Sequence, residues 1–263
     1  MSKLSVPAPI GFKVEGEIGV GKLKSSLHGS PTTTVRQHLI SALANGTNLG
    51  QINKIVLVDS NGTERDNTTS LNYSINTGSN QATLTITGTI NITASYTVAR
   101  VRAYSGTNLY FDTSLSTTIN VNNGDAASVT LTITISYSGT MTYGSITETG
   151  DATYPTHVLT YRIAQVLSGG TTASNLKVSA VYFELFYAGT DVETSKTVST
   201  TNTVSSDGLS LTISCSWTAD DNYEIFYIAV RLNDGSEGWA YTLHTSIEVP
   251  YGSTVSYTET VSA

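Results

Sequence analysis

Apolar and polar residues alternate along most of this 263-residue chain. In residues 82–92, for example, Leu84, Ile86 and Ile90 are separated by polar positions that are mostly threonine. One face of such a segment can pack inward while the other meets water. Similar segments follow one another at short intervals, with Gly, Asn and Asp residues between them. This pattern predicts an all-β protein made of antiparallel strands.

We expect strands in both halves of the chain. In the first half they cover residues 35–44, 53–59, 70–76, 82–92, 96–104, 109–112 and 127–137. In the second half they cover residues 158–167, 177–187, 196–203, 209–217, 223–232, 238–247 and 254–262. Residues 38–46 also show helical spacing, through Leu39, Ile40 and Leu43. We favour a strand there, with a helix as the alternative.

The two halves resemble each other in sequence. Sliding the chain against itself by about 128 residues aligns a ladder of identical positions, as expected for an internal repeat. The aligned pairs are Leu115 with Leu243, Ile119 with Ile247, Val121 with Val249 and Gly124 with Gly252. Upstream, with a somewhat smaller offset, residues 38–46 face residues 162–170. We therefore predict an internal duplication that gives two tandem antiparallel β-sandwich domains, of jelly-roll or immunoglobulin-like type.

The duplication sets the expected domain boundaries. Residues 31–138 form the first sandwich and residues 158–263 form the second. Residues 139–157 between them are polar and contain Gly and Pro, so they form a linker or one additional strand pair. Residues 1–30 precede the first repeat, and we predict that they form an extended N-terminal arm.

Apolar residues alternate within this N-terminal arm, at Phe12, Val14, Ile18 and Val20. Such a segment can add a strand to an exposed sheet edge of another subunit. We therefore expect these four residues to form a subunit interface. A disordered tail, or a strand of the chain's own first domain, is the alternative. If the arm serves assembly, deletion of residues 1–26 leaves a folded but unassembled protein.

Composition narrows the range of functions. Charged residues make up 13% of the chain, whereas 76 of its 263 residues are Ser or Thr, and the net charge is −7. Clustered Lys and Arg, which binding to nucleic acid requires, are not evident, so we expect no nucleic-acid partner. No apolar run is long enough to insert into a membrane. The first 26 residues also lack the apolar stretch of a secretory signal, so we expect a route to the outside such as a virus particle.

The sequence shows no set of residues that carries a known chemistry. The four His residues are scattered and Cys215 is the single cysteine, so paired metal ligands are missing. The acidic loops at residues 59–66 and 220–224 lack the spacing of a calcium site, and we interpret them as turns. We predict no catalytic, cofactor-binding or metal-ligating residues, no cofactor and no enzymatic activity.

Aromatic residues leave one binding function open. The chain has 15 Tyr and 2 Trp, enough to line a platform for sugars. Trp239 and Tyr241 are our candidates for contact with a glycan, although both positions also suit core packing.

The first half resembles a known kind of module. It opens with VRQHLISALANG at residues 35–46 and closes with a ladder of spaced residues, which are Leu109, Ser114, Ile119, Val121, Gly124, Val129, Ile133 and Ile135. This order of signals resembles a β-rich module of phage tail-fibre and archaeal-virus virion proteins. The second half keeps Ile247, Val249 and Gly252 but has Tyr257 and Val261 at the last apolar positions.

The resemblance implies a structural protein of the virion surface, namely a turret, capsid-decorating or fibre subunit. It would be located on the virion or otherwise outside the cell, and its partners would be copies of itself in a filament or ring, other virion proteins or host-surface glycans. A cellular extracellular filament or surface-layer subunit is the first alternative. A β-sandwich module that binds a glycan or receptor is the second.

Overall fold

The computed structural model describes the backbone of residues 2–143, 146–150 and 158–263, and the side chains of residues 8–142, 147–150 and 158–263. Strands dominate the described residues, so the protein is mainly β as predicted. The chain begins with β1 (Ser2–Val20), β2 (Leu23–Pro31) and the helix α1 (Thr33–Asn45). The first half continues with β3 (Lys54–Asp59), β4 (Glu64–Thr68), β5 (Leu71–Gly78), β6 (Gln81–Asn91), β7 (Tyr96–Ser105), β8 (Asn108–Val121) and β9 (Ala126–Tyr137).

The second half begins with a short hairpin, β10 (Thr140–Tyr143) and β11 (Ile146–Thr149). The helix α2 (Leu159–Ser168) and the 3₁₀ turn η1 (Ala173–Leu176) follow. The remaining strands are β12 (Val178–Tyr187), β13 (Glu193–Ser199), β14 (Thr201–Val204), β15 (Ser210–Thr218), β16 (Tyr223–Leu232), β17 (Glu237–Val249) and β18 (Thr254–Ser262). The hairpin corresponds to the additional strand pair that was one alternative for residues 139–157.

Two segments predicted as strands, residues 35–44 and 158–167, are helices. The first starts where the Thr32 side chain accepts a hydrogen bond from the Val35 backbone N–H at 3.4 Å. It ends at Gly46, which has φ +75° and closes the helix as a left-handed cap. Its apolar residues are buried at helical spacing. The prediction was wrong because helical spacing in so short an apolar run was read as strand alternation.

The strands of the two halves pair in the same order. In the first half β4-β3-β7-β8 and β5-β6-β9 are neighbours. In the second half β13-β12-β16-β17 and β14-β15-β18 are neighbours. Each half thus has one group of four strands and one group of three. In chain order, the group of four begins with β3 after α1 in the first half, and with β12 after α2 and η1 in the second half.

The two halves differ in how these groups are joined. In the first half β1 and β2 connect the groups, because β9 pairs with β1, β1 with β2 and β2 with β8. In the second half the four-stranded group is a separate sheet. The three-stranded group continues instead through β18 into the N-terminal part of β1, which in turn pairs with β10.

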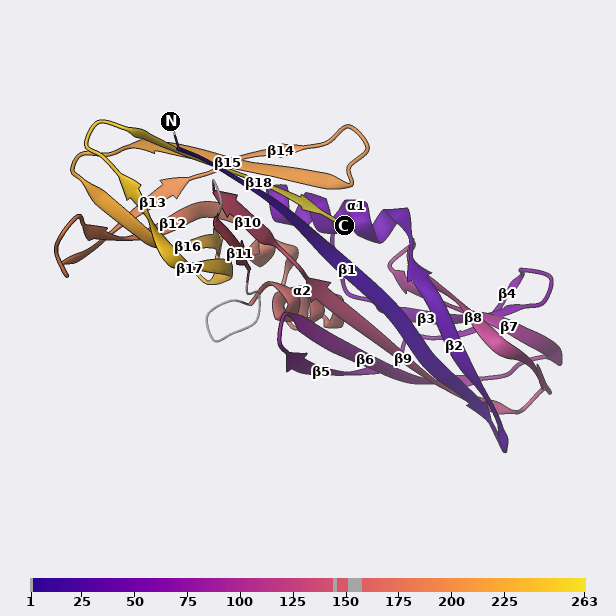
Figure 1. The fold of residues 1–263 in the computed structure, drawn as a ribbon. Coiled ribbons are helices and arrows are strands. Elements are labelled where there is room, and N and C mark those ends of the chain that lie inside the picture. The colour runs from indigo at the N-terminus through magenta and orange to yellow at the C-terminus, as the bar shows by residue number, and fades with distance from the viewer. Residues whose placement is uncertain (1, 144–145, 151–157) are drawn as a thin grey trace.

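The strand β1 belongs to both halves, as Figure 1 shows for the long indigo strand that crosses the molecule. Residues 10–20 pair antiparallel with β9, whereas residues 2–9 pair parallel with β18. Residues 1–30 are therefore not a separate arm where the structure describes them. They form β1 and β2, two strands of the protein's own sheets, which was one of the alternatives.

The residues predicted to form a subunit interface pack against the protein's own core. Val14, Ile18 and Val20 are buried in the core, so they present no free surface in the single chain. Phe12 is partly buried, with its ring 6.1 Å from that of Phe111 on β8. Deletion of residues 1–26 would remove these core positions, so the structure favours a destabilised variant over the folded one that the sequence led us to expect.

Candidate functional site

The place where β1 enters the second half is the most unusual junction in the described structure. Residues 2–9 lie between β18 on one side and β10 on the other. Their pairing with β18 is parallel, whereas the other strand pairs found among the described residues are antiparallel. The backbone register places Val6 beside Glu259 of β18. We call this position of residues 2–9, between β18 and β10, the slot.

A buried carboxylate lies beside the slot. Glu259 is 0% exposed, and its carboxylate accepts a hydrogen bond from the Trp239 indole N–H at 2.8 Å. The hydroxyls of Tyr241 and Tyr257 donate to it at 2.9 and 2.5 Å. The Tyr137 hydroxyl donates at 3.2 Å. We call these five residues the Glu259 cluster; it joins Tyr137, the last residue of β9, to β17 and β18 of the second half.

The surroundings of Glu259 decide its protonation. Removal from water raises the pKa of this carboxyl to about 7, although hydrogen bonds from the tyrosines and the indole oppose that rise. Burial also raises the pKa of Tyr137, Tyr241 and Tyr257 well above the ordinary value, because a phenolate beside the carboxylate would be desolvated and repelled. The tyrosines therefore remain neutral donors, and Glu259 titrates near neutrality.

Two glycines leave room for the cluster. A β-carbon on Gly139 would overlap the Tyr137 hydroxyl and would lie 2.6 Å from that of Tyr241. A β-carbon on Gly150 would lie 2.8 Å from the Tyr241 ring. The chain on both sides of the β10–β11 hairpin thus packs closely on these rings. The cluster is a filled, hydrogen-bonded core that links the strands β9, β17 and β18. Its Glu259 carboxyl can bind or release a proton.

The proposed glycan contacts are part of this core. Trp239 and Tyr241 are each 0% exposed, and both donate to Glu259. A sugar could reach neither ring without opening the sheets, so the structure does not support a glycan contact at these two residues. The alternation of apolar residues in β17 was also compatible with core packing, and the burial of both side chains supports that interpretation.

The acidic loop at residues 59–66 is a turn held by its own side chains. Asp59 accepts hydrogen bonds from the backbone N–H groups of Asn61 and Thr63, each at 2.9 Å, and pairs with Arg65 at 2.6 Å. The Thr63 backbone hydrogen bond, together with Arg65, holds the pKa of Asp59 below its ordinary value. Both carboxylate oxygens of Asp59 therefore already have partners within the turn, and a cation would have to displace them.

The second acidic loop, at residues 220–224, behaves in the same way. Asp220 accepts from Lys196 and from the Tyr223 hydroxyl, both at 2.8 Å. These two hydrogen bonds lower the pKa of Asp220 to about 2. Across the part of the chain that the structure describes, no group of three or more His, Cys, Asp and Glu residues could hold a metal ion.

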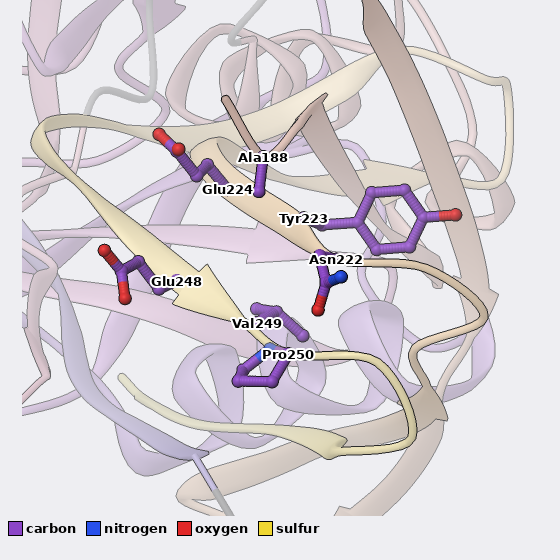
Figure 2. Close-up of a pocket in the computed structure, with 7 residues that line it drawn as sticks. All are labelled: Ala188, Asn222, Tyr223, Glu224, Glu248, Val249 and Pro250. Atoms are coloured by element: carbon purple, nitrogen blue, oxygen red, sulfur yellow. The ribbon is translucent and has the colours of Figure 1, made fainter. Parts of the chain in front are cut away.

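A shallow pocket of about 320 Å³ lies near this loop, between the ends of β16 and β17. Figure 2 shows that Glu224 and Glu248 extend on one side while the Tyr223 ring points to the other. The two glutamates are cross-strand partners, and Glu224 accepts from Ser246 at 3.0 Å. The pocket thus presents two carboxylates and small apolar groups, without a nucleophile or a general base paired to one.

The remaining candidate residues are dispersed. His38 lies beside the Tyr110 hydroxyl at 3.0 Å and His244 beside Glu148 at 2.7 Å, on different elements. His157 lies outside the described residues. Cys215 is partly buried on β15, and burial raises the pKa of its thiol to about 12.

Comparison with known proteins adds no relative. No family model matches the chain, and no curated protein or solved structure matches it. Neither helix in the described parts has the length and apolar character needed to cross a membrane. The interpretation of function therefore depends on the fold, the slot and the Glu259 cluster.

Proposed function

We propose that this protein is a structural, self-assembling subunit of a virion surface, as a turret, capsid-decorating or fibre component. The observation that carries the proposal is that residues 2–9, from one end of the chain, complete the sheet of the half at the other end. A strand that completes a distant sheet is suited to joining copies of a subunit, because backbone pairing gives affinity and side-chain pockets give specificity.

The proposal also includes two tandem sandwiches that arose by duplication. The equal order of strand pairs in both halves supports it, as do the glycines Gly124 and Gly252, which have φ +91° and +75° in corresponding turns. In the second half the Phe183 ring of β12 lies 5.9 Å from Trp217 of β15 and 6.3 Å from Tyr257 of β18. The two groups of strands therefore face each other there, as in a sandwich.

Sheet edges offer further contacts between copies. The edge strand β4 carries Glu64, Arg65 and Asp66, and charges of this kind discourage pairing with another chain. The edge strand β14, at the other end of the same sheet, is uncharged and has the exposed Val204. We infer that β14 is the better edge for contacts between subunits.

The location is tested by quantitative mass spectrometry on purified virus particles and on cell-surface fractions from infected and uninfected cultures. A virion subunit should be enriched in the particles at a fixed ratio to the other coat proteins. Enrichment in the surface fraction of uninfected cells would contradict the virion proposal and favour a cellular filament or surface layer.

A further inference from the structure

The second half is incomplete without residues 2–9. Next to the slot, β18 carries the buried residues Tyr257, Glu259 and Val261, at the register positions of Leu4, Val6 and Ala8. Ala8 is itself 1% exposed. If these eight residues left the slot, the β18 edge would lose its backbone partners and the Glu259 cluster would lie beside an open edge. The slot therefore has to be filled in the folded protein.

The walls of the slot belong to the second half alone. One wall is β18, which pairs with β15 along nine residues. The other wall is the β10–β11 hairpin, which is tied to β17 because the Glu148 carboxylate accepts from the His244 backbone N–H at 2.8 Å and meets its ring at 2.7 Å. Both walls are thus held by contacts that do not involve residues 2–9.

The first half has no equivalent slot. There, residues 10–20 of β1 pair directly with β9, the counterpart of β18. The hairpin of β1 and β2 precedes α1 as the hairpin of β10 and β11 precedes α2. In the second half this hairpin lies one strand farther from β18, and the space between is taken by a parallel strand from the start of the chain. The slot is therefore an addition to the repeated plan.

The segment also has a natural pivot. Residues 2–9 pair with β18, and from Ile10 onward the same strand pairs with β9. Pro7 and Pro9 lie at this change of partner, and proline cannot donate to a sheet ladder. At this change of partner neither proline donates a backbone hydrogen bond, and the Pro9 carbonyl accepts one from the Ser138 N–H at 3.2 Å.

We propose that residues 2–9 of one copy fill the slot of a neighbouring copy, so that subunits are joined by strand exchange. This inference rests on the proposed self-assembly and names its contact. The same backbone bonds form whether the segment comes from the same chain or from another, so exchange costs no pairing and depends on protein concentration. The donating segment and the accepting slot are different surfaces, so repeated exchange gives a ring or an open filament.

The test is a disulfide between the segment and the slot in the full-length chain. The variant carries Cys215→Ala, Ser5→Cys and Thr142→Cys, because Ser5 and Thr142 are Cα partners in the β1–β10 pair. The protein is oxidised under assembly conditions, denatured and run on a non-reducing gel. Strand exchange predicts covalent dimers and higher multimers that a reductant returns to single chains.

The matched control moves the pair to the other part of the same strand. The variant Cys215→Ala, Lys13→Cys, Thr134→Cys joins β1 to β9 and should form its disulfide within single chains. Disulfides confined to single chains in the Ser5→Cys, Thr142→Cys variant, or no disulfide at that pair, would overturn the exchange. Light scattering on the same samples distinguishes strand exchange from self-assembly. Assemblies without intermolecular disulfides would refute only strand exchange. Monomers in every sample would refute self-assembly as well.

Discussion

Glu259 is an ionisable residue at a core position where the first half of the chain has an apolar one. In the alignment by 128 residues it occupies the position of Leu131, in a run where Tyr257 and Val261 also face the core. The alternation of β18 thus predicts that Glu259 points inward. The sequence alone does not single out Glu259, because a lone Glu among threonines has the composition of a solvent-facing position. Three of its four donors, Tyr137, Trp239 and Tyr241, also lie outside β18.

The buried carboxyl makes the stability of the protein depend on pH. Its pKa is about 7 in the folded protein, against an ordinary value of 4.5. Between these values the native state holds a proton that the unfolded chain releases, so the free energy of unfolding falls as pH rises through this window. At about 1.4 kcal/mol per pKa unit, the loss from pH 4.5 to above pH 7 is about 3 kcal/mol.

The substitution Glu259→Gln tests this linkage, because it keeps the shape and removes the titration. Urea unfolding at several pH values should show the decline in the native protein and a nearly flat profile in the variant. The exposed Glu248→Gln variant should keep the decline. An unchanged decline in the Glu259→Gln protein would show that another group is responsible.

Asp220 acts in a different pH range. Because its pKa is lowered to about 2, its contribution to the free energy of unfolding is lost only below about pH 4.

Cys215 provides a second prediction at a single residue. Burial raises the pKa of its thiol to about 12, so the reactive thiolate is scarce near neutral pH. Alkylation by iodoacetamide at pH 8, followed by mass spectrometry, should be at least tenfold slower in the folded protein than in urea. Equal rates in the two conditions would contradict the burial of this thiol.

Among the elements, most strands could be predicted from alternation, whereas the first helix was only the alternative for residues 38–46 and the second helix was not predicted. The strands at residues 53–59, 82–92, 127–137 and 254–262 were expected within one or two residues of β3, β6, β9 and β18. The helix α1 depends on its caps, Thr32 and Gly46, and on packing against other elements. The pairing of residues 2–9 with β18 joins opposite ends of the chain, and no local pattern specifies such a contact.

The pairing of β1 with β9 requires a glycine at one point. A β-carbon on Gly16 would overlap the backbone carbonyl oxygen of Thr130 in β9. Because backbone on both sides must shift, Gly16→Ala should lower the free energy of unfolding by about 1–3 kcal/mol in chemical denaturation. At Gly170 the nearest atom would be 3.6 Å away, so Gly170→Ala is the matched control and should change stability by less. Equal effects of the two substitutions would contradict the close approach.

At the scale of the whole molecule, β1 joins the halves through backbone pairing and Tyr137 joins them through the Glu259 cluster. We therefore expect the two halves to unfold together in a single calorimetric transition at neutral pH. Deletion of residues 2–9 removes the strand from the slot and should separate an early transition of the second half from a later one of the first. A single transition of unchanged midpoint in that variant would show that the slot does not stabilise the second half.

Self-assembly of the 263-residue chain can be measured by negative-stain electron microscopy combined with light scattering, at several protein concentrations. A self-assembling subunit gives regular rings, filaments or clusters whose mass grows with concentration. A monomer of 27.8 kDa at every concentration would contradict self-assembly.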